Sequence, residues 1–210
     1  VPELTRDDVA ALQHAADMDW RNIDPSIFGT LFERGLNPAK RSQLGAHYTS
    51  REDIEALIEP VVMDPLRREW AAVRAEAETL VNMPVFTKQR RDQTSQVLRA
   101  FLNRLQTVTV LDPACGSGNF LFVTLQKLKD LEKEVIVFAA RHVGGLFPGV
   151  HPGQLRALEI NKYAHELAQV TVWIGYLQWR HENGFDEMAD PVLRPLTNIK
   201  RMDAILAHDA

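Results

Sequence analysis

The sequence predicts an α/β fold in which a short sheet of three parallel strands follows a helical N-terminal segment. Short apolar runs alternate with long apolar-periodic stretches in the second half of the chain, in the order strand, helix, strand, helix, strand. The first third instead shows capping side chains followed by apolar residues at helical spacing. We therefore expect a helical segment over residues 1–105 and an α/β part over residues 106–210.

The composition is that of an ordinary globular protein. Of the 210 residues, 45% are hydrophobic and 25% are charged, which excludes collagen-like, disordered and low-complexity chains. The single cysteine, Cys115, excludes an intramolecular disulfide and fits a reducing, cytoplasmic compartment. No stretch reaches the ~20 apolar residues of a membrane span, and no signal peptide is evident. The net charge of −4 disfavours a module that grips DNA phosphate alone, and the first residue, Val1, hints at a segment of a longer polypeptide.

Capping residues place the helices of the first half. Helices are expected to begin at Thr5, at Asp24–Pro25, at Ser50 with a kink at Pro60, at Leu66 and at about Gln93. The stretch from Pro84 to Asp92 is expected to be a loop that carries Lys88, Arg90 and Arg91. Those cations could contact DNA phosphate, but a solvated loop explains them at least as well.

The elements of the second half follow from its pattern of apolar residues. Strands are expected at Thr107–Leu111, Gln154–Ile160 and about Asn198–Met202. Helices are expected from Phe120 to Arg141 and from Lys162 to about His181, with a loop over Gly144–Gly153. Trp173, Tyr176 and Trp179 lie at helical spacing, so they fit packing against the sheet better than base stacking.

The turn from Asp112 to Asn119 carries the sharpest chemical signal. It follows an apolar strand and opens a helix, and its Gly116 and Gly118 permit close approach of a ligand to the backbone. In a dinucleotide-binding turn the helix amides hold pyrophosphate. Here Leu121 occupies the place of the third glycine, and Asp112 would repel a phosphate. The turn therefore predicts an adenosine ligand with a cationic amino-acid tail.

Two further acids end the other strands. Glu159 can accept hydrogen bonds from both ribose hydroxyls, although it follows Gly118 by 41 residues, more than the ~20 of a compact nucleotide fold. The loop over Gly144–Gly153 accounts for the excess length. Asp203 can accept from an adenine amino group. Three strand-end carboxylates beside one glycine turn predict an S-adenosylmethionine pocket.

Several stretches resemble motifs of the γ-type adenine-N6 DNA methyltransferases. The run from Asp112 to Leu121 resembles motif I, and the run from Gly45 to Ser50 resembles motif X, which precedes motif I in this class. Leu158–Asn161 resembles motif II and Met202–Ala204 resembles motif III. The stretch Ile27–Arg34 is similar to the MmeI-like restriction–modification branch. The resemblance spans roughly residues 27–205 and implies a partial Rossmann-like S-adenosylmethionine-dependent methyltransferase fold.

The resemblance implies a role for each residue that matches a motif. Tyr48 and Thr49 would contact the methionine carboxylate, and Asp112 would hold the amino group. Glu159 would bind the ribose, Ile160 would pack on the adenine and Asp203 would meet its amino group. The turn itself would line the pocket, through Pro113, Ala114, Cys115, Gly116, Gly118, Asn119 and Phe120.

One family motif is missing. The family's catalytic motif IV is an Asn/Asp-Pro-Pro-aromatic sequence, and the chain contains no Pro-Pro pair. We therefore expect the chain to bind cofactor without catalysing transfer, and expect double-stranded DNA to be recognised by regions outside it. With three strands, the edge of the first strand would be open, so we expect it to be covered by a second copy or by a longer enzyme.

Other functions stay open at this point. An S-adenosylmethionine-dependent RNA or protein methyltransferase would share the pocket, and a non-catalytic helical interaction module could keep a vestigial one. An NAD-dependent oxidoreductase is disfavoured by Asp112 and Leu121. No His/Asn arrangement supports Cys115 as a nucleophile. The histidines do not form a metal cluster, so no metal is expected; those weighed are His142, His151, His165 and His181.

Overall fold

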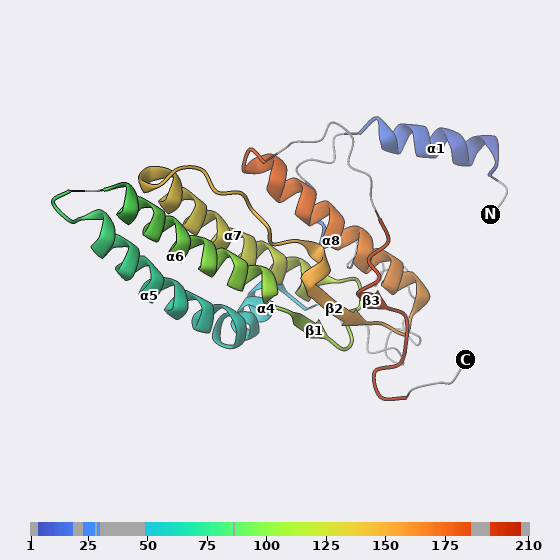
Figure 1. Cartoon of the computed structure of the whole chain (residues 1–210). Coiled ribbons are helices and arrows are strands. Elements are labelled where there is room, and N and C mark those ends of the chain that lie inside the picture. Colours follow the sequence, from blue (N-terminus) through green and yellow to red (C-terminus); the bar gives the residue numbers. More distant parts are fainter. Residues whose placement is uncertain are drawn as a thin grey trace.

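The computed structural model describes residues 4–18, 23–27, 29, 49–85, 87–185 and 194–206. Long helices run side by side, and a small sheet lies at one end of them (Figure 1). The helices are α1 (Arg6–Ala16), α4 (Arg51–Ile58), α5 (Asp64–Val81), α6 (Lys88–Thr107), α7 (Asn119–His142) and α8 (Lys162–Glu182). The strands are β1 (Val110–Asp112), β2 (Leu155–Leu158) and β3 (Ile199–Lys200). Every helix within these ranges is too short or too polar to cross a membrane.

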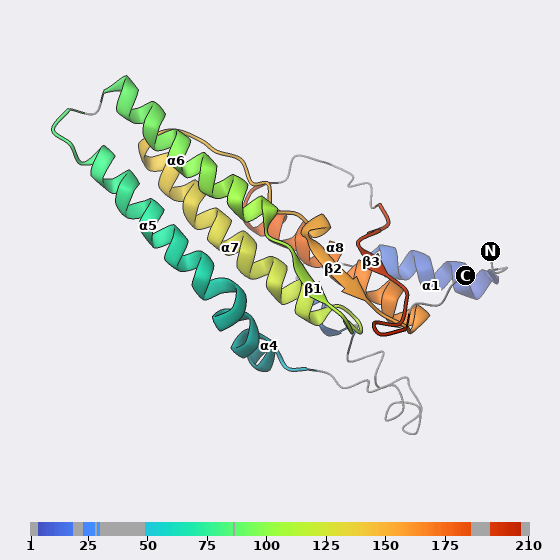
Figure 2. The same cartoon turned by 60° about the horizontal axis from the view of Figure 1, so that its bottom comes forward.

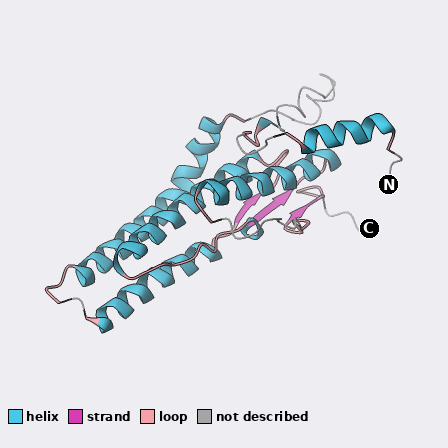
Figure 3. Cartoon of the chain, turned by 90° about the horizontal axis from the view of Figure 1, so that it is seen from above, coloured by secondary structure: helices cyan, strands magenta, loops and turns pink. Residues whose placement is uncertain are grey.

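The sheet has the predicted composition of three parallel strands. Its order is β1-β2-β3, and Asp112 lies in register with Ala157. One face is buried beneath the helices, through Leu155, Ala157 and Ile199, while Arg156 and Lys200 point to the exposed face. Figure 3 shows the helices gathered over one side of the strands. The expected α/β class is confirmed, and among the described residues β1 pairs with β2 alone, which leaves its other edge free.

Capping residues start the first helices as the sequence indicates. Thr5 and Asp8 form a reciprocal capping box at α1, and the Ser50 hydroxyl accepts a hydrogen bond from the Asp53 N–H at α4. Pro60 produces no break. Because proline has no N–H to donate, the chain widens into one π-helical turn, Glu59–Met63, and continues directly into α5. The helix expected after Asp24 and the stretch that resembles motif X lie largely outside the described residues.

The start of α6 differs from the prediction. The loop expected up to Asp92 ends at Thr87, whose hydroxyl accepts a hydrogen bond from the Arg90 N–H at 3.3 Å. Lys88, Arg90 and Arg91 therefore belong to the first turn of a 20-residue helix. The prediction gave weight to the polar run and overlooked Thr87 as a capping residue.

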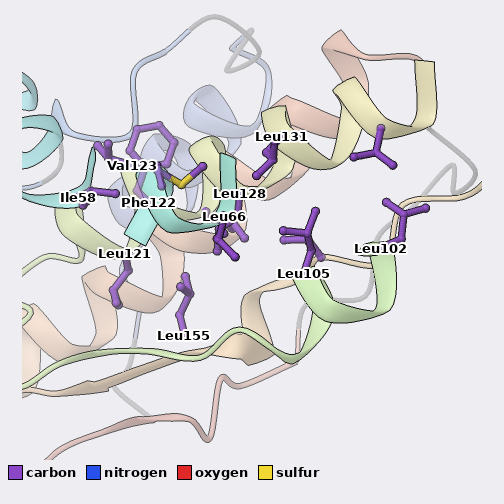
Figure 4. Packing of buried hydrophobic residues seen from close by; sticks show 14 of the residues in the cluster. Ile58, Leu66, Leu102, Leu105, Leu121, Phe122, Val123, Leu128, Leu131 and Leu155 are labelled. Carbon is purple, nitrogen blue, oxygen red and sulfur yellow. The ribbon is translucent and has the colours of Figure 1, made fainter. Parts of the chain in front are cut away.

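The core lies where α5, α6 and α7 meet the buried face of the sheet. Trp70 of α5 stacks on Phe101 of α6, with ring centroids 5.5 Å apart, and meets Phe138 of α7 edge-on at 5.9 Å. Leu105 of α6 and Leu128 and Leu131 of α7 belong to the same buried cluster, part of which Figure 4 shows. The helical segment and the α/β part thus share one hydrophobic core, because α7 packs against α4, α6 and α8.

Candidate cofactor-binding site

The turn between β1 and α7 depends on two glycines with different neighbours. Gly116 and Gly118 have φ angles of 54° and 88°, a region that side chains other than glycine adopt only under strain. A Cβ at Gly118 would lie 3.0 Å from the Cα of Ala168, so this glycine permits α8 to pack closely on the turn. A Cβ at Gly116 would meet nothing within 4 Å. Gly116 therefore faces open space in which a ligand can approach the backbone.

Glu159 is the residue that holds this turn in place. It follows β2 directly, and its Oε2 accepts a hydrogen bond from the Gly116 N–H at 2.9 Å, while its Oε1 accepts from the Asn161 N–H at 2.7 Å. The Cys115 N–H donates to the Leu158 carbonyl at 3.1 Å. Since each carboxylate oxygen has two lone pairs, Glu159 keeps acceptor capacity on both oxygens. The structure therefore brings the two predicted motifs into direct contact.

Asp112 places a second carboxylate beside Glu159. It ends β1, and its Oδ1 accepts a hydrogen bond from the Ala114 N–H at 3.0 Å. Burial raises the pKa of Asp112; the Ala114 N–H opposes that rise and the charge of Glu159 adds to it. A phosphate here would add a third negative charge, whereas an ammonium or sulfonium group would relieve the repulsion. The arrangement can hold a cationic ligand.

Cys115 contributes its backbone to the turn. Its side chain is buried in the hydrophobic core. Burial raises the pKa of the thiol, and the charges of Asp112 and Glu159 raise it further, which disfavours the nucleophilic thiolate.

The third predicted acid lies at the same edge of the sheet. β3 continues alongside Glu159, because the Glu159 N–H donates to the Lys200 carbonyl at 3.0 Å and the Met202 N–H donates to the Glu159 carbonyl at 3.2 Å. Asp203 follows, and its Oδ1 accepts from the N–H groups of Ile205 and Leu206 at 2.8 and 2.9 Å. The structure thus places Asp203 near the end of β2, with its carboxylate capping the next turn.

Exposed apolar side chains flank these carboxylates. Ile160 is 61% exposed directly after Glu159, and Tyr163 is 60% exposed at the start of α8. Large apolar groups at the carboxyl edge of the sheet suit contact with a flat ring system. The position predicted to pack on an adenine is therefore available for such contact.

The remaining predicted residues differ in burial and in surroundings. Asn119 is buried, lines a small cavity with Asp24, Ser26 and Arg51, and has no hydrogen-bond partner for its Oδ1. Phe120 is half-buried against the hydrophobic core, and Pro113 and Ala114 are exposed on the turn. Thr49 is half-buried just before α4, whose first residues meet the start of α7. Tyr48 lies outside the described residues.

Sequence reasoning missed the backbone partner of Glu159. The N–H of Asn161 was not expected to contribute, yet it fixes one carboxylate oxygen while the Asn161 side chain caps α8 by accepting from the Tyr163 and Ala164 N–H groups. An asparagine two residues after a strand-end acid, and directly before a helix, is the signal that could have revealed it.

Comparison with known proteins supports the family suggested by the motifs. The family model described as MmeI, DNA-methyltransferase domain, matches residues 87–209. DNA methyltransferase A of Bacillus subtilis (strain 168) is 30% identical over 167 residues, which cover 79% of this chain and 17% of that protein.

A solved structure shows the same similarity in three dimensions. The Type IIL restriction–modification enzyme MmeI, solved in complex with DNA, is 31% identical with a TM-score of 0.70. The match covers 96% of this chain and 26% of that one, so the chain spans a minor part of both relatives. Because the family match takes in more than half of the sequence, the chain belongs to the MmeI DNA-methyltransferase domain family.

Proposed function

We propose that this chain is the S-adenosylmethionine-binding part of a site-specific DNA adenine-N6 methyltransferase of the restriction–modification type. The observation that carries the proposal is the pair of carboxylates, Asp112 and Glu159, at a glycine turn whose Gly116 faces open space. Family membership supports DNA methylation as the activity. Adenine-N6 specificity is supported by the order of the motifs that resemble the γ-type enzymes.

The chemistry of these residues fits the cofactor. Asp112 would hold the amino group, because an ammonium relieves its repulsion from Glu159. Glu159 would accept from the ribose hydroxyls through lone pairs that the Gly116 and Asn161 amides leave free. Ile160 would cover the adenine ring, with Asp203 near its amino group.

The same residues disfavour a dinucleotide. Two carboxylates stand where a pyrophosphate would add negative charge. Leu121, at the position of a third glycine, is buried in the core, so its side chain supports packing of α7. Figure 4 shows Leu121 directed toward Leu155 of β2.

When bound, S-adenosylmethionine supplies a methyl group activated by its positive sulfur. The residues of this chain would orient that group but would not prepare a base to receive it. The sequence contains no Pro-Pro pair and hence no Asn/Asp-Pro-Pro-aromatic motif. We therefore expect the chain alone to bind cofactor without transferring methyl, and expect double-stranded DNA to be read by other regions of a longer protein. The free edge of β1 is where we expect a further strand or a second copy, which sedimentation at increasing concentration would reveal.

Calorimetric titration with S-adenosylmethionine tests the proposal, with NAD as the comparison ligand. We expect saturable binding of S-adenosylmethionine and no heat from NAD. Asp112→Ala should weaken binding by at least about tenfold, the equivalent of ~1.4 kcal/mol for one charge-assisted contact. Asp64→Ala is the matched control, because Asp64 is exposed at the start of α5 and lies outside the site.

Two results would contradict the proposal. Binding of NAD in place of S-adenosylmethionine would favour an oxidoreductase-like turn. Silence toward both ligands, in a sample whose circular dichroism shows a folded protein, would favour the non-catalytic helical module.

A further inference from the structure

A second cavity lies at the opposite end of α7 from the glycine turn. It has a volume of about 500 Å³ and lies between the start of α6 and the end of α7, which Figure 2 shows side by side. α7 has 24 residues, so about 36 Å of helix separates the cavity from the turn. Its lining includes Thr87, Lys88, Arg91, Ala140, Arg141 and His142. Nothing in the cofactor site accounts for so many basic side chains.

Charge at this cavity is unbalanced. Several cations elsewhere on the bundle are paired with acids, as Arg74 is with Glu78 at 2.9 Å and Lys127 with Glu59 at 3.1 Å. Among the described residues, none of those that line the cavity is acidic. Within the part of the chain that the structure describes, Lys88, Arg91 and Arg141 form no ion pair.

The cations are set on a rigid frame. The Arg91 Nε and Nη2 both donate to the Val143 carbonyl, at 3.1 and 2.9 Å, which fixes the guanidinium at the end of α7. That contact also caps α7, so the helix dipole explains part of the charge. It does not explain Lys88, which lies in the first turn of α6, where the helix has no acidic residue and its amides add positive potential.

We propose that this cavity binds a phosphodiester of DNA, which gives the chain a backbone contact of its own. The inference that this phosphate belongs to DNA rests on the proposed function. Guanidinium and ammonium groups around a hollow wide enough to admit part of a DNA backbone suit phosphate. Of the described side chains that line the cavity, Ala140 alone is apolar, so the cavity offers little to anchor a peptide. The contact positions DNA without reading sequence.

Fluorescence anisotropy of a labelled duplex of about 20 base pairs, titrated with the 210-residue chain from about 25 to 150 mM salt, tests this site. The variant Lys88→Gln/Arg141→Gln removes two charges from side chains with no ion pair. It should bind DNA about tenfold more weakly at low salt, with a salt slope shallower by about 2. Arg68→Gln/Arg99→Gln is the matched control, since both residues are exposed on the same bundle outside the cavity. It should stay within about twofold of wild type.

Three results would overturn the inference, and two others would identify a different ligand. The inference is overturned if the wild-type chain does not bind DNA at low salt, if the cavity variant binds like wild type, or if both variants weaken equally. Inorganic phosphate that competes at equal charge concentration would show a site for free phosphate instead, and a polyglutamate peptide that competes as well as DNA would show a general acidic-polymer site. Titration with S-adenosylmethionine in the same samples separates the two proposals, because the cavity variant should bind it like wild type.

Discussion

The two ends of α7 carry opposite charges, each of the sign that its helix dipole attracts, so each end suits a ligand of the other sign. The N-terminus of α7, which by itself attracts anions, lies beside Asp112 and Glu159. The C-terminus lies beside Arg91, Arg141 and the basic start of α6. At the first end we expect the carboxylates to repel phosphate and to favour a cation. At the second end there are more cations than the partial negative charge of the helix C-terminus would balance. The length of α7 thus separates the site proposed for a cationic ligand from the site proposed for phosphate.

Once the backbone has built a binding site, its side chains select the ligand. A glycine turn opening a helix is shared by sites for phosphate and for amino-acid nucleosides. We expect Asp112 to decide between them here, because burial and the charge of Glu159 raise its pKa. Further negative charge at this position would be unfavourable.

The largest effect is expected in the middle of α7, where a buried ion pair joins the helix to the loop that precedes β2. Lys129 Nζ contacts Glu132 Oε2 at 3.1 Å and the Val150 carbonyl at 3.0 Å, and lies 4.3 Å from the centroid of the Trp179 ring. Lys129→Met leaves the Glu132 charge buried without its partner, so the free energy of unfolding should fall by about 3–5 kcal/mol. Urea denaturation measures it. Lys133→Met, on the exposed face of the same helix, should change it by less than about 1 kcal/mol, and an equal loss in both would show that the pair is not responsible.

The next effect is expected at the acidic end of α7. Gly118→Ala introduces a Cβ 3.0 Å from the Ala168 backbone at a φ of 88°, so strain and overlap should together cost about 3 kcal/mol of unfolding free energy. Gly184→Ala has a φ of 71° with nothing within 4 Å, and should show the conformational cost alone, about 1 kcal/mol.

The same two glycine variants also test whether the two ends of α7 bind their ligands independently. Gly118→Ala should also abolish binding of S-adenosylmethionine, because the turn must shift away from Ala168, yet leave DNA binding at the distal cavity intact. Equal stability losses in the two variants would mean that contact with α8 does not constrain the turn.

Much of the acidic end could be predicted from the sequence because its signals are local. A strand, a glycine turn and a helix follow one another within residues 107–141, and each acid stands directly at the end of its strand. The parallel order of the strands followed from the alternation of elements. The contact of Glu159 with the Gly116 N–H did not, since it joins residues 43 apart through one side-chain rotamer.

The basic end could not be predicted for the same reason. Lys88 and Arg141 are 53 positions apart, and they line one cavity because α6 packs against α7. Placing Lys88 in a loop also hid its position in a helical first turn, which Thr87 establishes by capping. Asn119 shows the converse case, because its side chain turns toward Asp24 and Ser26 although its position in the turn predicted a role at the cofactor.

The smallest effect is a pH dependence confined to the acidic end. The folded state raises the pKa of Asp112 above its usual value of 3.8, so folding favours its protonated form. The stability that this preference contributes is fully present below pH 3.8 and is lost as the pH rises through the raised pKa. Asp112→Asn, which keeps the shape without the charge, should therefore slightly increase the free energy of unfolding at neutral pH.

Ligand binding should show the opposite dependence. A cationic ligand lowers the pKa of Asp112, so binding releases a proton and the affinity for S-adenosylmethionine should rise with pH until the carboxyl is fully ionised. Titrations between about pH 5 and 8 on wild type and Asp112→Asn would measure it, because titration of the ligand itself is common to both. The variant should bind more weakly throughout, with the part of the slope due to Asp112 removed. Parallel curves would show that Asp112 does not meet the charge of the ligand, and would leave Glu159 as the one acid at this end of α7 that selects it.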